Sequence, residues 1–303
     1  MIACMCNKCG LSFDAEPQGG HRLMCGSSTS VADVATLTRG EQADLLFTSP
    51  PYGQQRDYTT GGIGDWDALM QGVFSIIPMA PSGQVLVNLG LIHKEAEWQP
   101  YWTNWIEWMR AHGWRRFGWY VWDQGPGLPG DWNGRLAPSF EFVFHFNVEA
   151  KRARKTRENK HAGKALTSGG LRSADGSIKE KTGVGKAIQH SSIPDNVFRV
   201  SRHRGGLGAA GKHPAPFPVA LCTEIVMAFS DPGDVLFEPF CGSGTTIISA
   251  EQNGRRVMAM ELAPIYVDVA VRRFQLFADA SAILDGDGRT FEQISIDRAG
   301  GAK

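Results

Sequence analysis

Several common features are missing from this 303-residue sequence, and each absence excludes a class of protein. No apolar run reaches the ~18 residues that a membrane-spanning helix needs. The first residues, Met1 to Cys6, lack the basic start and long apolar stretch of a signal peptide, so we expect a cytoplasmic protein without membrane contact. In that reducing compartment the six cysteines are expected to be thiols or metal ligands rather than disulfides.

Net charge is also missing, because 31 basic side chains balance 31 acidic ones. The balance conceals an uneven distribution. Residues 151–212 hold 15 Lys and Arg against 4 Asp and Glu, a net charge of +11, and the remainder carries −11. A segment this basic is suited to an anionic partner. The hydrophobic content of 42% otherwise indicates an ordinary folded protein.

The last third of the chain has the pattern of an α/β fold. Apolar runs at 234–238 and 256–261 predict strands, and helical spacing predicts helices at 218–229, 247–253 and 266–277. This alternation predicts a doubly wound, mostly parallel sheet. Further strands are expected at 44–48, 84–89, 117–122 and 140–146, and a helix at 66–79.

Three other segments have distinctive compositions. Trp98, Trp102, Trp105 and Trp108 follow the spacing of one helix face, which predicts an aromatic core or a subunit interface. Residues 1–26 are rich in cysteine and look irregular. Residues 151–211 have little apolar periodicity, and we expect them to be mobile until they meet a partner.

A glycine turn lies between the strand at 234–238 and the next helix. Gly242 and Gly244 allow close approach of a ligand to backbone N–H groups at the helix start. Glu261 ends the following strand, where an acid typically binds the two ribose hydroxyls. Ile247 replaces the third glycine of the dinucleotide pattern, and no Gly-Lys-Ser/Thr follows. An adenosyl cofactor without a pyrophosphate therefore fits best.

A second motif, Ser49-Pro50-Pro51-Tyr52, follows the strand at 44–48. The prolines stiffen a loop at the end of a strand, where α/β enzymes place their chemistry. Ser49 and the Pro50 carbonyl can accept hydrogen bonds from a ring amine while Tyr52 stacks on the ring. These four residues are the predicted catalytic residues.

Together the two motifs resemble those of the DNA amino-methyltransferases that use S-adenosylmethionine. Thr48 to Tyr52 resembles their catalytic loop, Phe237 to Thr246 their cofactor turn, and Glu141-Phe142 a further motif. The resemblance implies a Rossmann-like methyltransferase fold, double-stranded DNA as partner, and a homodimer. By the same resemblance, cofactor-binding residues are Thr48, Ser27, Lys212, His213, Glu238, Phe240, Cys241, Gly242, Ser243, Gly244, Thr245, Thr246, Glu261 and Leu262.

The catalytic loop precedes the cofactor turn, an order that resembles the β-arranged class and its phage or prophage orphan members, found in bacterial or phage-infected cells. The implied division is a cysteine-rich segment (1–20), a catalytic half (21–150), a basic target-recognition region (151–211), a cofactor-binding half (212–280) and a tail (281–303). DNA-binding residues are then expected to be Lys151, Arg152, Arg154, Lys155, Arg157, Arg199, Arg202 and Arg204.

The resemblance leaves two target amines open. In this family a Ser-Pro-Pro loop leans towards cytosine N4, whereas Gly53 and the phage-like appearance favour adenine N6, which we predict. The absence of a Pro-Cys dipeptide excludes the cytosine-C5 enzymes. An RNA or protein-amide methyltransferase and a DNA-binding protein without activity are competing hypotheses, and motif order and intact motifs argue against them.

Two details depart from familiar patterns. Many relatives carry Gly-Asp where Gly26-Ser27 stands, so the adenine contact of that Asp falls here to Ser27 or Ser28. Cys6-x-x-Cys9 resembles half of a zinc site, with Cys4 and Cys25 as further candidates. Because no second pair of cysteines follows, we predict no bound metal.

Overall fold

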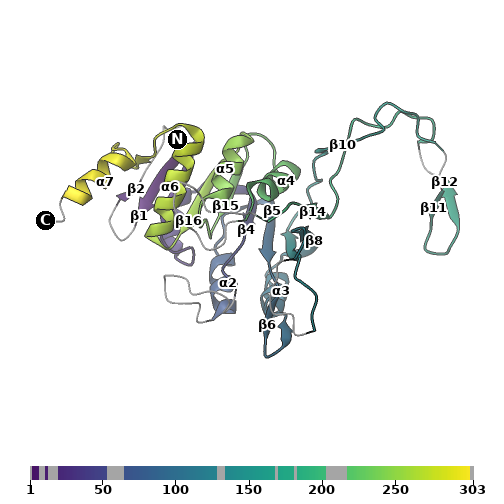
Figure 1. Cartoon of the computed structure of the whole chain (residues 1–303), viewed down its shortest axis with the longest axis horizontal. Helices are drawn as coiled ribbons and strands as arrows, with labels where there is room; N and C mark the ends of the chain where they lie inside the picture. Colours follow the sequence, from purple (N-terminus) through teal and green to yellow (C-terminus); the bar gives the residue numbers. More distant parts are fainter. Residues whose placement is uncertain are drawn as a thin grey trace.

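The computed structural model describes residues 2–6, 11–12, 20–52, 65–127, 134–167, 170–180, 183–202 and 217–300. These residues form a central sheet with helices on both faces, and a long arm that projects away from it (Figure 1). Within these ranges, no helix is long and apolar enough to cross a membrane.

The central sheet contains eleven strands among the described residues. Most neighbours are parallel, whereas β9 runs antiparallel to both β5 and β8, and β2 antiparallel to β1. The strands in spatial order are β14 (Val197–Arg199), β8 (Arg115–Asp123), β9 (Phe140–Asn147), β5 (Met79–Leu89), β4 (Ala43–Thr48), β15 (Val235–Glu238), β16 (Arg256–Glu261), β3 (His21–Cys25), β1 (Ile2–Cys6) and β17 (Ile283–Leu284), with β2 (Leu11–Ser12) beside β1.

Two groups of helices cover the sheet. On one side, α1 (Val31–Thr38), α2 (Trp66–Phe74) and α3 (Thr103–Ala111) bury Leu37, Met70 and Trp105 against it. On the other, α4 (Val219–Phe229), α5 (Thr245–Gln252), α6 (Pro264–Ala278) and α7 (Phe291–Gly300) contribute to a second core. The predicted doubly wound, mostly parallel α/β fold is thereby confirmed.

Local sequence signals explain where several of these helices begin. Ser30 caps α1 by accepting a hydrogen bond from the Asp33 N–H, and Asp65 caps α2 through the Ala68 N–H. At the start of α6, Pro264 is tolerated because the first turn of a helix needs no N–H partner there. These helices therefore begin where short-range chemistry places them.

The tryptophan prediction was only partly right. Trp102 and Trp105 are buried, which confirms the aromatic core, and α3 includes Trp105 and Trp108. Trp98 instead lies in β7 (Glu97–Gln99), which pairs with β6 (Ile92–Lys94), and its side chain is 60% exposed. The spacing suggested a helix face, but the chain before residue 103 forms a hairpin.

Three other boundaries differ from the sequence predictions. Residues 1–26 are not wholly irregular, since β1 and β3 are parallel neighbours within the sheet. α2 ends at Phe74 instead of reaching 79. β5 begins at Met79, and its pairing with β4 shifts register between Met79 and Gln84 because Pro81 lacks the N–H that a regular ladder needs.

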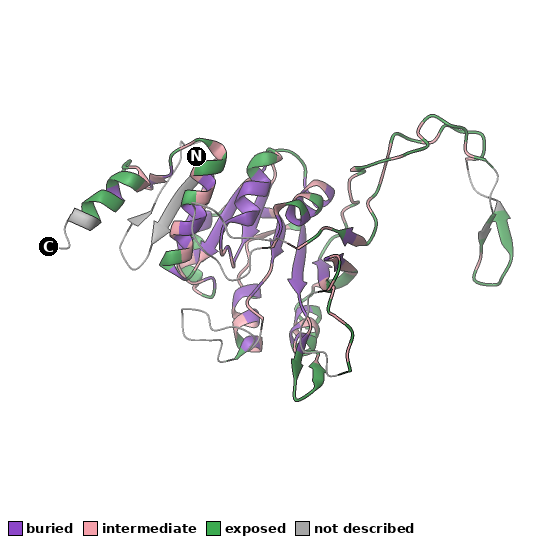
Figure 2. Cartoon of the chain, viewed as in Figure 1, coloured by how far each residue is buried: buried purple, intermediate pink, exposed green. Residues whose placement is uncertain are grey.

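Residues 157–192, called the arm below, form a long antiparallel excursion rather than a featureless loop. β10 (Arg157–Glu158) pairs with β13 (Ser191–Ser192), and β11 (Gly170–Arg172) pairs with β12 (Ile178–Glu180). A bridge between Ala165 and Ala187 links these two pairs. Most of the arm is exposed, as the green ribbon in Figure 2 shows. After the arm, β14 returns to the central sheet beside β8.

Candidate active site

The parallel strands bring the predicted motifs to one edge of the sheet. β4 ends at Thr48, β15 at Glu238 and β16 at Glu261, and these three strands are neighbours. Their carboxyl ends therefore meet at the same edge, which is where open α/β sheets bind ligands. Motifs that lie about 190 residues apart in the chain are neighbours in space.

Glu238 joins the catalytic loop to the glycine turn. Its side chain is only 1% exposed, and its carboxylate accepts hydrogen bonds from the Thr48 hydroxyl and from the Thr246 hydroxyl, the latter at 2.8 Å. The Phe240 N–H donates to it at 3.1 Å. Burial raises the pKa of Glu238 to about 7, although these donors work in the opposite direction. Because its carboxylate already accepts these three hydrogen bonds, Glu238 holds the loop and the turn together and is not open to solvent.

The glycine turn requires glycine at Gly244. This residue has a φ of +77° as the N-cap of α5, and an added Cβ would lie 3.0 Å from the Ala270 Cβ on α6. Arg273, one turn further along α6, donates to the Ser243 carbonyl at 3.1 Å and to the Thr245 hydroxyl at 2.9 Å. Contacts from helix α6 thus stabilise the backbone conformation of the turn.

Glu261 lies beside the turn. Its carboxylate accepts hydrogen bonds from the N–H groups of Gly242 and Ala263, both at 2.8 Å. Burial raises its pKa, and the backbone donors partly offset that effect. Leu262 follows with 48% of its surface exposed. A carboxylate fixed in this manner, with lone pairs left over, can accept hydrogen bonds from ligand hydroxyl groups.

The end of β3 supplies another polar group. The Gly26 N–H donates to the Glu261 carbonyl at 3.1 Å, which places Ser27 next to the end of β16. The Ser27 N–H donates to the Asp33 carboxylate at 2.9 Å. The chain thus has a carboxylate beside Gly26-Ser27, the position where many relatives carry Gly-Asp, but it comes from the first turn of α1. Sequence reasoning missed Asp33 because the residue lies six positions later.

On the other side of Thr48 the catalytic loop is held by its neighbours. The Trp66 indole N–H donates to the Pro51 carbonyl at 2.9 Å. The Tyr52 hydroxyl donates to the Glu141 carboxylate at 2.6 Å and lies 3.3 Å from the Ser49 hydroxyl. Burial and the Glu141 charge raise the pKa of Tyr52 well above its ordinary value. Tyr52 is therefore a neutral hydrogen-bond donor at physiological pH.

The predicted cofactor residues differ in burial, and two of them lie outside the described residues. Cys241 has its side chain in the core, and Thr245 and Thr246 are buried. Lys212 and His213 fall outside the ranges that the structure describes. The remaining cofactor residues of the prediction gather around the turn: Thr48, Ser27, Glu238, Phe240, Gly242, Ser243, Gly244, Glu261 and Leu262.

The predicted DNA-binding residues separate into two groups. Lys151 forms ion pairs with Asp231 and Asp234, Arg154 with Asp231, and the Arg202 guanidinium donates to Gln124 and the Pro138 carbonyl. These contacts tie three of the predicted residues to the body. Arg152, Lys155, Arg157 and Arg199 are exposed, and Arg204 lies outside the described residues.

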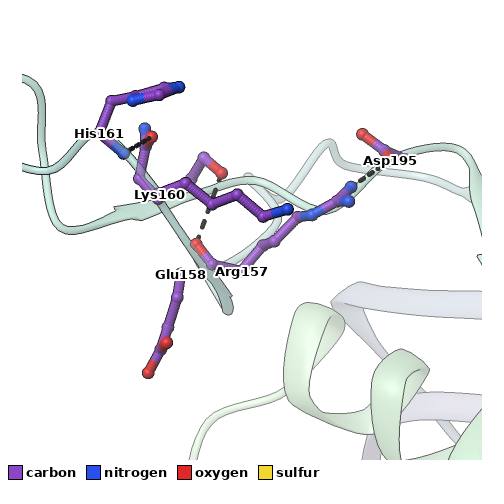
Figure 3. A pocket seen from close by; sticks show the side chains of 7 residues that line it. Arg157, Glu158, Lys160, His161 and Asp195 are labelled. Atoms are coloured by element: carbon purple, nitrogen blue, oxygen red, sulfur yellow. Dashed lines mark hydrogen bonds and ion pairs between the residues drawn. The ribbon is translucent and has the colours of Figure 1, made fainter.

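At the base of the arm is an open hollow of about 460 Å³ (Figure 3). The Asp195 carboxylate forms one ion pair with Arg157 and a second, at 3.1 Å, with Arg199. The hollow is lined by Arg157, Glu158, Asn159, Lys160, His161, Ser192 and Asp195. This mixed lining suits a polar, charged partner better than an apolar one.

No metal centre is evident among the described residues, where no group of three His, Cys, Asp or Glu side chains is arranged to hold an ion. Cys4 and Cys6 lie in β1, whose backbone alone is described, and Cys6 is the register partner of Cys25. Cys9 falls outside the described residues. The four cysteines remain untested candidates.

Comparison with known proteins identifies the class to which this site belongs. Residues 43–272 match the family model described as DNA methylase, the N6/N4 methyltransferase family. The chain belongs to this family, and it is thus an S-adenosylmethionine-dependent DNA methyltransferase by descent.

The relatives that match this chain in sequence are themselves named as methyltransferases. The orphan methyltransferase M.BamHII of Bacillus amyloliquefaciens is 27% identical over 259 residues, which cover 83% of this chain and 96% of that protein. The DNA adenine methyltransferase YhdJ of Escherichia coli K12 is 31% identical over 116 residues, 35% of this chain and 40% of the relative.

Solved structures show the same fold. The PvuII DNA methyltransferase, described as cytosine-N4-specific, superposes with a TM-score of 0.63 over 94% of both chains at 20% identity. A putative DNA modification methylase of Thermus thermophilus gives a TM-score of 0.56 at 21% identity, over 86% of this chain and 97% of that one.

Proposed function

We propose that this protein methylates the exocyclic amine of a base that is flipped out of double-stranded DNA, with adenine N6 as the target. The observation that carries the proposal is that the Glu238 carboxylate accepts hydrogen bonds from both Thr48 and Thr246. This contact joins the loop that would bind the amine to the turn that would bind the cofactor. Family membership supports the DNA substrate and the cofactor.

The cofactor side fits an adenosyl group. Gly242 and Gly244 keep side chains away from the start of α5, and Glu261 presents a fixed carboxylate at the end of β16. We assign the ribose hydroxyls to Glu261 and the adenine to the region of Ser27 and Asp33. When bound there, S-adenosylmethionine supplies an electrophilic methyl group. The N–H groups at the start of α5 and the turn held by Arg273 would orient the bound cofactor.

The loop side fits an amine that becomes cationic. A ring amine is a poor nucleophile because its lone pair is delocalised into the ring. Acceptors at the Ser49 hydroxyl and the Pro50 carbonyl would draw the two N–H bonds out of the ring plane and would stabilise the developing positive charge. Tyr52 would stack on the flipped base and replace part of the lost base stacking.

A second target, cytosine N4, is favoured by one observation. Ser49 stands where the adenine-directed members of the family more often have Asp, and Ser-Pro-Pro leans towards cytosine N4. Named relatives include a DNA adenine methyltransferase and a cytosine-N4-specific enzyme. Both candidates share the chemistry above and differ only in the ring that carries the amine.

We assign target recognition to residues 151–211, between the halves 21–150 and 212–280. A two-stranded antiparallel ribbon has the width that the major groove of DNA admits, and the arm is built as such a ribbon. Exposed basic side chains follow its length and would contact phosphates or guanines. They are Arg157, Lys160, Lys164, Arg172, Lys179 and Lys186, and Lys155 lies just before the arm.

A product analysis tests this function. The protein is incubated with methyl-labelled S-adenosylmethionine and mixed duplex DNA, the DNA is digested to nucleosides, and the labelled nucleoside is identified. N6-methyl-2′-deoxyadenosine is expected, and N4-methyl-2′-deoxycytidine would select the second candidate. DNA that stays unlabelled while RNA or protein offered in its place is labelled, or DNA binding without any transfer, would overturn the proposal. Ser49→Ala serves as the negative control.

A further inference from the structure

Three polar side chains form a hydrogen-bonded row behind the catalytic loop. Glu141 lies near the start of β9, Tyr52 ends the described part of the loop, and Ser49 begins the motif. The Glu141 carboxylate is 2.6 Å from the Tyr52 hydroxyl, which is 3.3 Å from the Ser49 hydroxyl. The residues at the two ends of this row are 92 positions apart in the sequence, so the row depends on the fold.

We propose that Glu141 is a positioning residue which, through Tyr52, orients the Ser49 hydroxyl so that its lone pairs face the target amine. This inference rests on the proposed function, because it assigns a direction to the hydrogen bonds of the same site. It also gives a role to Glu141, which belongs to the Glu141-Phe142 motif, a motif whose function was not evident from the sequence.

The direction follows from the number of protons available. An ionised carboxylate only accepts hydrogen bonds, and a tyrosine hydroxyl has a single proton. At 2.6 Å that proton lies on the bond to Glu141. The Tyr52 oxygen then has only lone pairs to offer Ser49, so the Ser49 hydroxyl donates to Tyr52. Both lone pairs of the Ser49 oxygen are left to accept hydrogen bonds from elsewhere.

The neighbours of Tyr52 support this direction. Asn88 is buried, and its amide nitrogen donates to the Phe142 carbonyl at 3.0 Å. Its amide oxygen is thereby turned towards the Tyr52 hydroxyl at 3.4 Å, so it adds a second acceptor. The Tyr52 ring packs on Gly90, where an added Cβ would lie 2.9 Å from the ring. Among these contacts, every group near the Tyr52 proton favours its donation away from Ser49.

A serine in this position needs such a device. The carboxylate of an Asp-Pro-Pro loop can only accept hydrogen bonds, whereas a serine hydroxyl can also donate. A Ser49 proton that pointed at the amine would oppose an N–H bond and would repel the cationic product. With the row in place, Ser49 behaves towards the amine as an acceptor, as a carboxylate would.

A double-mutant cycle tests the inference in the full-length protein. We expect Glu141→Gln and Tyr52→Phe each to lower kcat roughly tenfold to thirtyfold, the size of one well-placed hydrogen bond. KM for DNA and the Kd for S-adenosylmethionine should stay within about twofold in Glu141→Gln. Because Glu141 acts only through the tyrosine hydroxyl, the double variant should be no slower than Tyr52→Phe. Glu97→Gln, an exposed site on β7, is the matched control.

Ser49→Asp provides a rescue. An aspartate accepts hydrogen bonds without help from Tyr52, so adding Glu141→Gln to Ser49→Asp should change kcat less than about twofold. Additive losses in the first cycle, or an equal loss from Glu141→Gln in both backgrounds, would overturn the inference and would indicate a purely structural glutamate.

A readout without turnover completes the test. Tyrosine labelled with ¹³C at Cζ gives five signals from the whole chain, and Tyr52→Phe identifies one of them. Among the residues that the structure describes, the titratable groups that face Tyr52 are Glu141 and Tyr101. Loss of the Glu141 charge should lower the pKa of Tyr52, and an unchanged titration would contradict the contact.

The two proposals fail in different ways. A wild-type protein that transfers no methyl group to DNA overturns the proposed function and this inference with it. A wild-type protein that methylates DNA, with a Glu141→Gln variant as fast as wild type, overturns the inference alone.

Discussion

The edge of the sheet and the arm differ in how firmly their polar side chains are held. At the edge, polar side chains such as Glu238 and Glu261 are fixed by hydrogen bonds to other elements. Along the arm, basic side chains such as Lys164 and Lys179 are exposed to solvent on a two-stranded ribbon. The edge is thus preorganised for one reaction, whereas the arm is held mainly by its own pairing.

This difference is consistent with the proposed separation of the chemical step at the edge from DNA recognition by the arm. Preorganised groups suit a transition state whose charges always develop at the same place. Phosphate contacts require positive charge near the surface but little fixed geometry, and they are formed when DNA arrives. Changes at the edge should therefore alter rate or stability, and changes in the arm should alter DNA binding.

Removal of the arm should have the largest effect. Arg157 and Ser192 are register partners, so a short Gly-Ser turn can replace residues 158–191 without strain. DNA affinity is expected to fall at least ~10³-fold, the usual margin between specific and non-specific binding, while the Kd for S-adenosylmethionine is unchanged. Gel-shift titration and calorimetry measure the two. Loss of cofactor binding would show that the arm also supports the edge.

Ser49→Ala should have the next largest effect. Loss of one acceptor for a developing cation is expected to lower kcat by ~10²- to 10³-fold. Cofactor binding should persist, because Ser49 lies on the amine side of Thr48. Single-turnover methylation measures the rate, and Ser82→Ala, at an exposed position before the buried part of β5, is the control. A variant as fast as wild type would remove Ser49 from the mechanism.

Glu238→Ala should affect stability. The change leaves the hydroxyls of Thr48 and Thr246 and the Phe240 N–H without their buried acceptor, which should lower the free energy of unfolding by about 3 kcal/mol. Urea denaturation measures this loss. Glu107→Ala, which removes exposed ion pairs with Arg110 and Arg116, should cost about 0.5 kcal/mol. Equal losses would mean that Glu238 does not join the two motifs.

The pH dependence of stability should show a smaller effect of Glu238. Its pKa rises from an ordinary 4.5 to about 7 on folding, so the native state binds the proton more tightly. This contribution is complete below about pH 4.5 and is lost as the pH rises through 7; between pH 5 and pH 7.5 the loss is about 2 kcal/mol. Comparison of wild type with Glu238→Gln at pH 5 and pH 7.5 isolates it, because glutamine does not titrate. Parallel curves would contradict the shifted pKa.

The sequence predicted the edge well because its motifs depend on local chemistry. Prolines after an apolar run mark the end of β4, and the glycines before α5 mark a turn, so both positions were evident from short segments. Parallel neighbours then place the two motifs at one edge. The burial of Glu238 was not predictable, because its partner Thr48 lies 190 positions away.

Contacts across the sheet were missed for the same reason. Glu141 meets Tyr52 only because β9 lies beside β5, and no local spacing indicates that order. A polar Asn88 inside an apolar run was a signal that could have marked the site. The strand pairing within the arm was not predicted because residues 151–211 have little apolar periodicity, and ribbon pairing depends on backbone hydrogen bonds more than on apolar spacing.

The return of β14 to the sheet has a further consequence. β14 follows the arm and pairs with β8, which precedes it, and β15 likewise pairs with β4. A chain cut by a protease within the arm would therefore leave two fragments whose strands alternate in one sheet and share one core. Such fragments should stay associated after cleavage, and a split enzyme assembled from two separately expressed pieces should regain its fold when they are mixed.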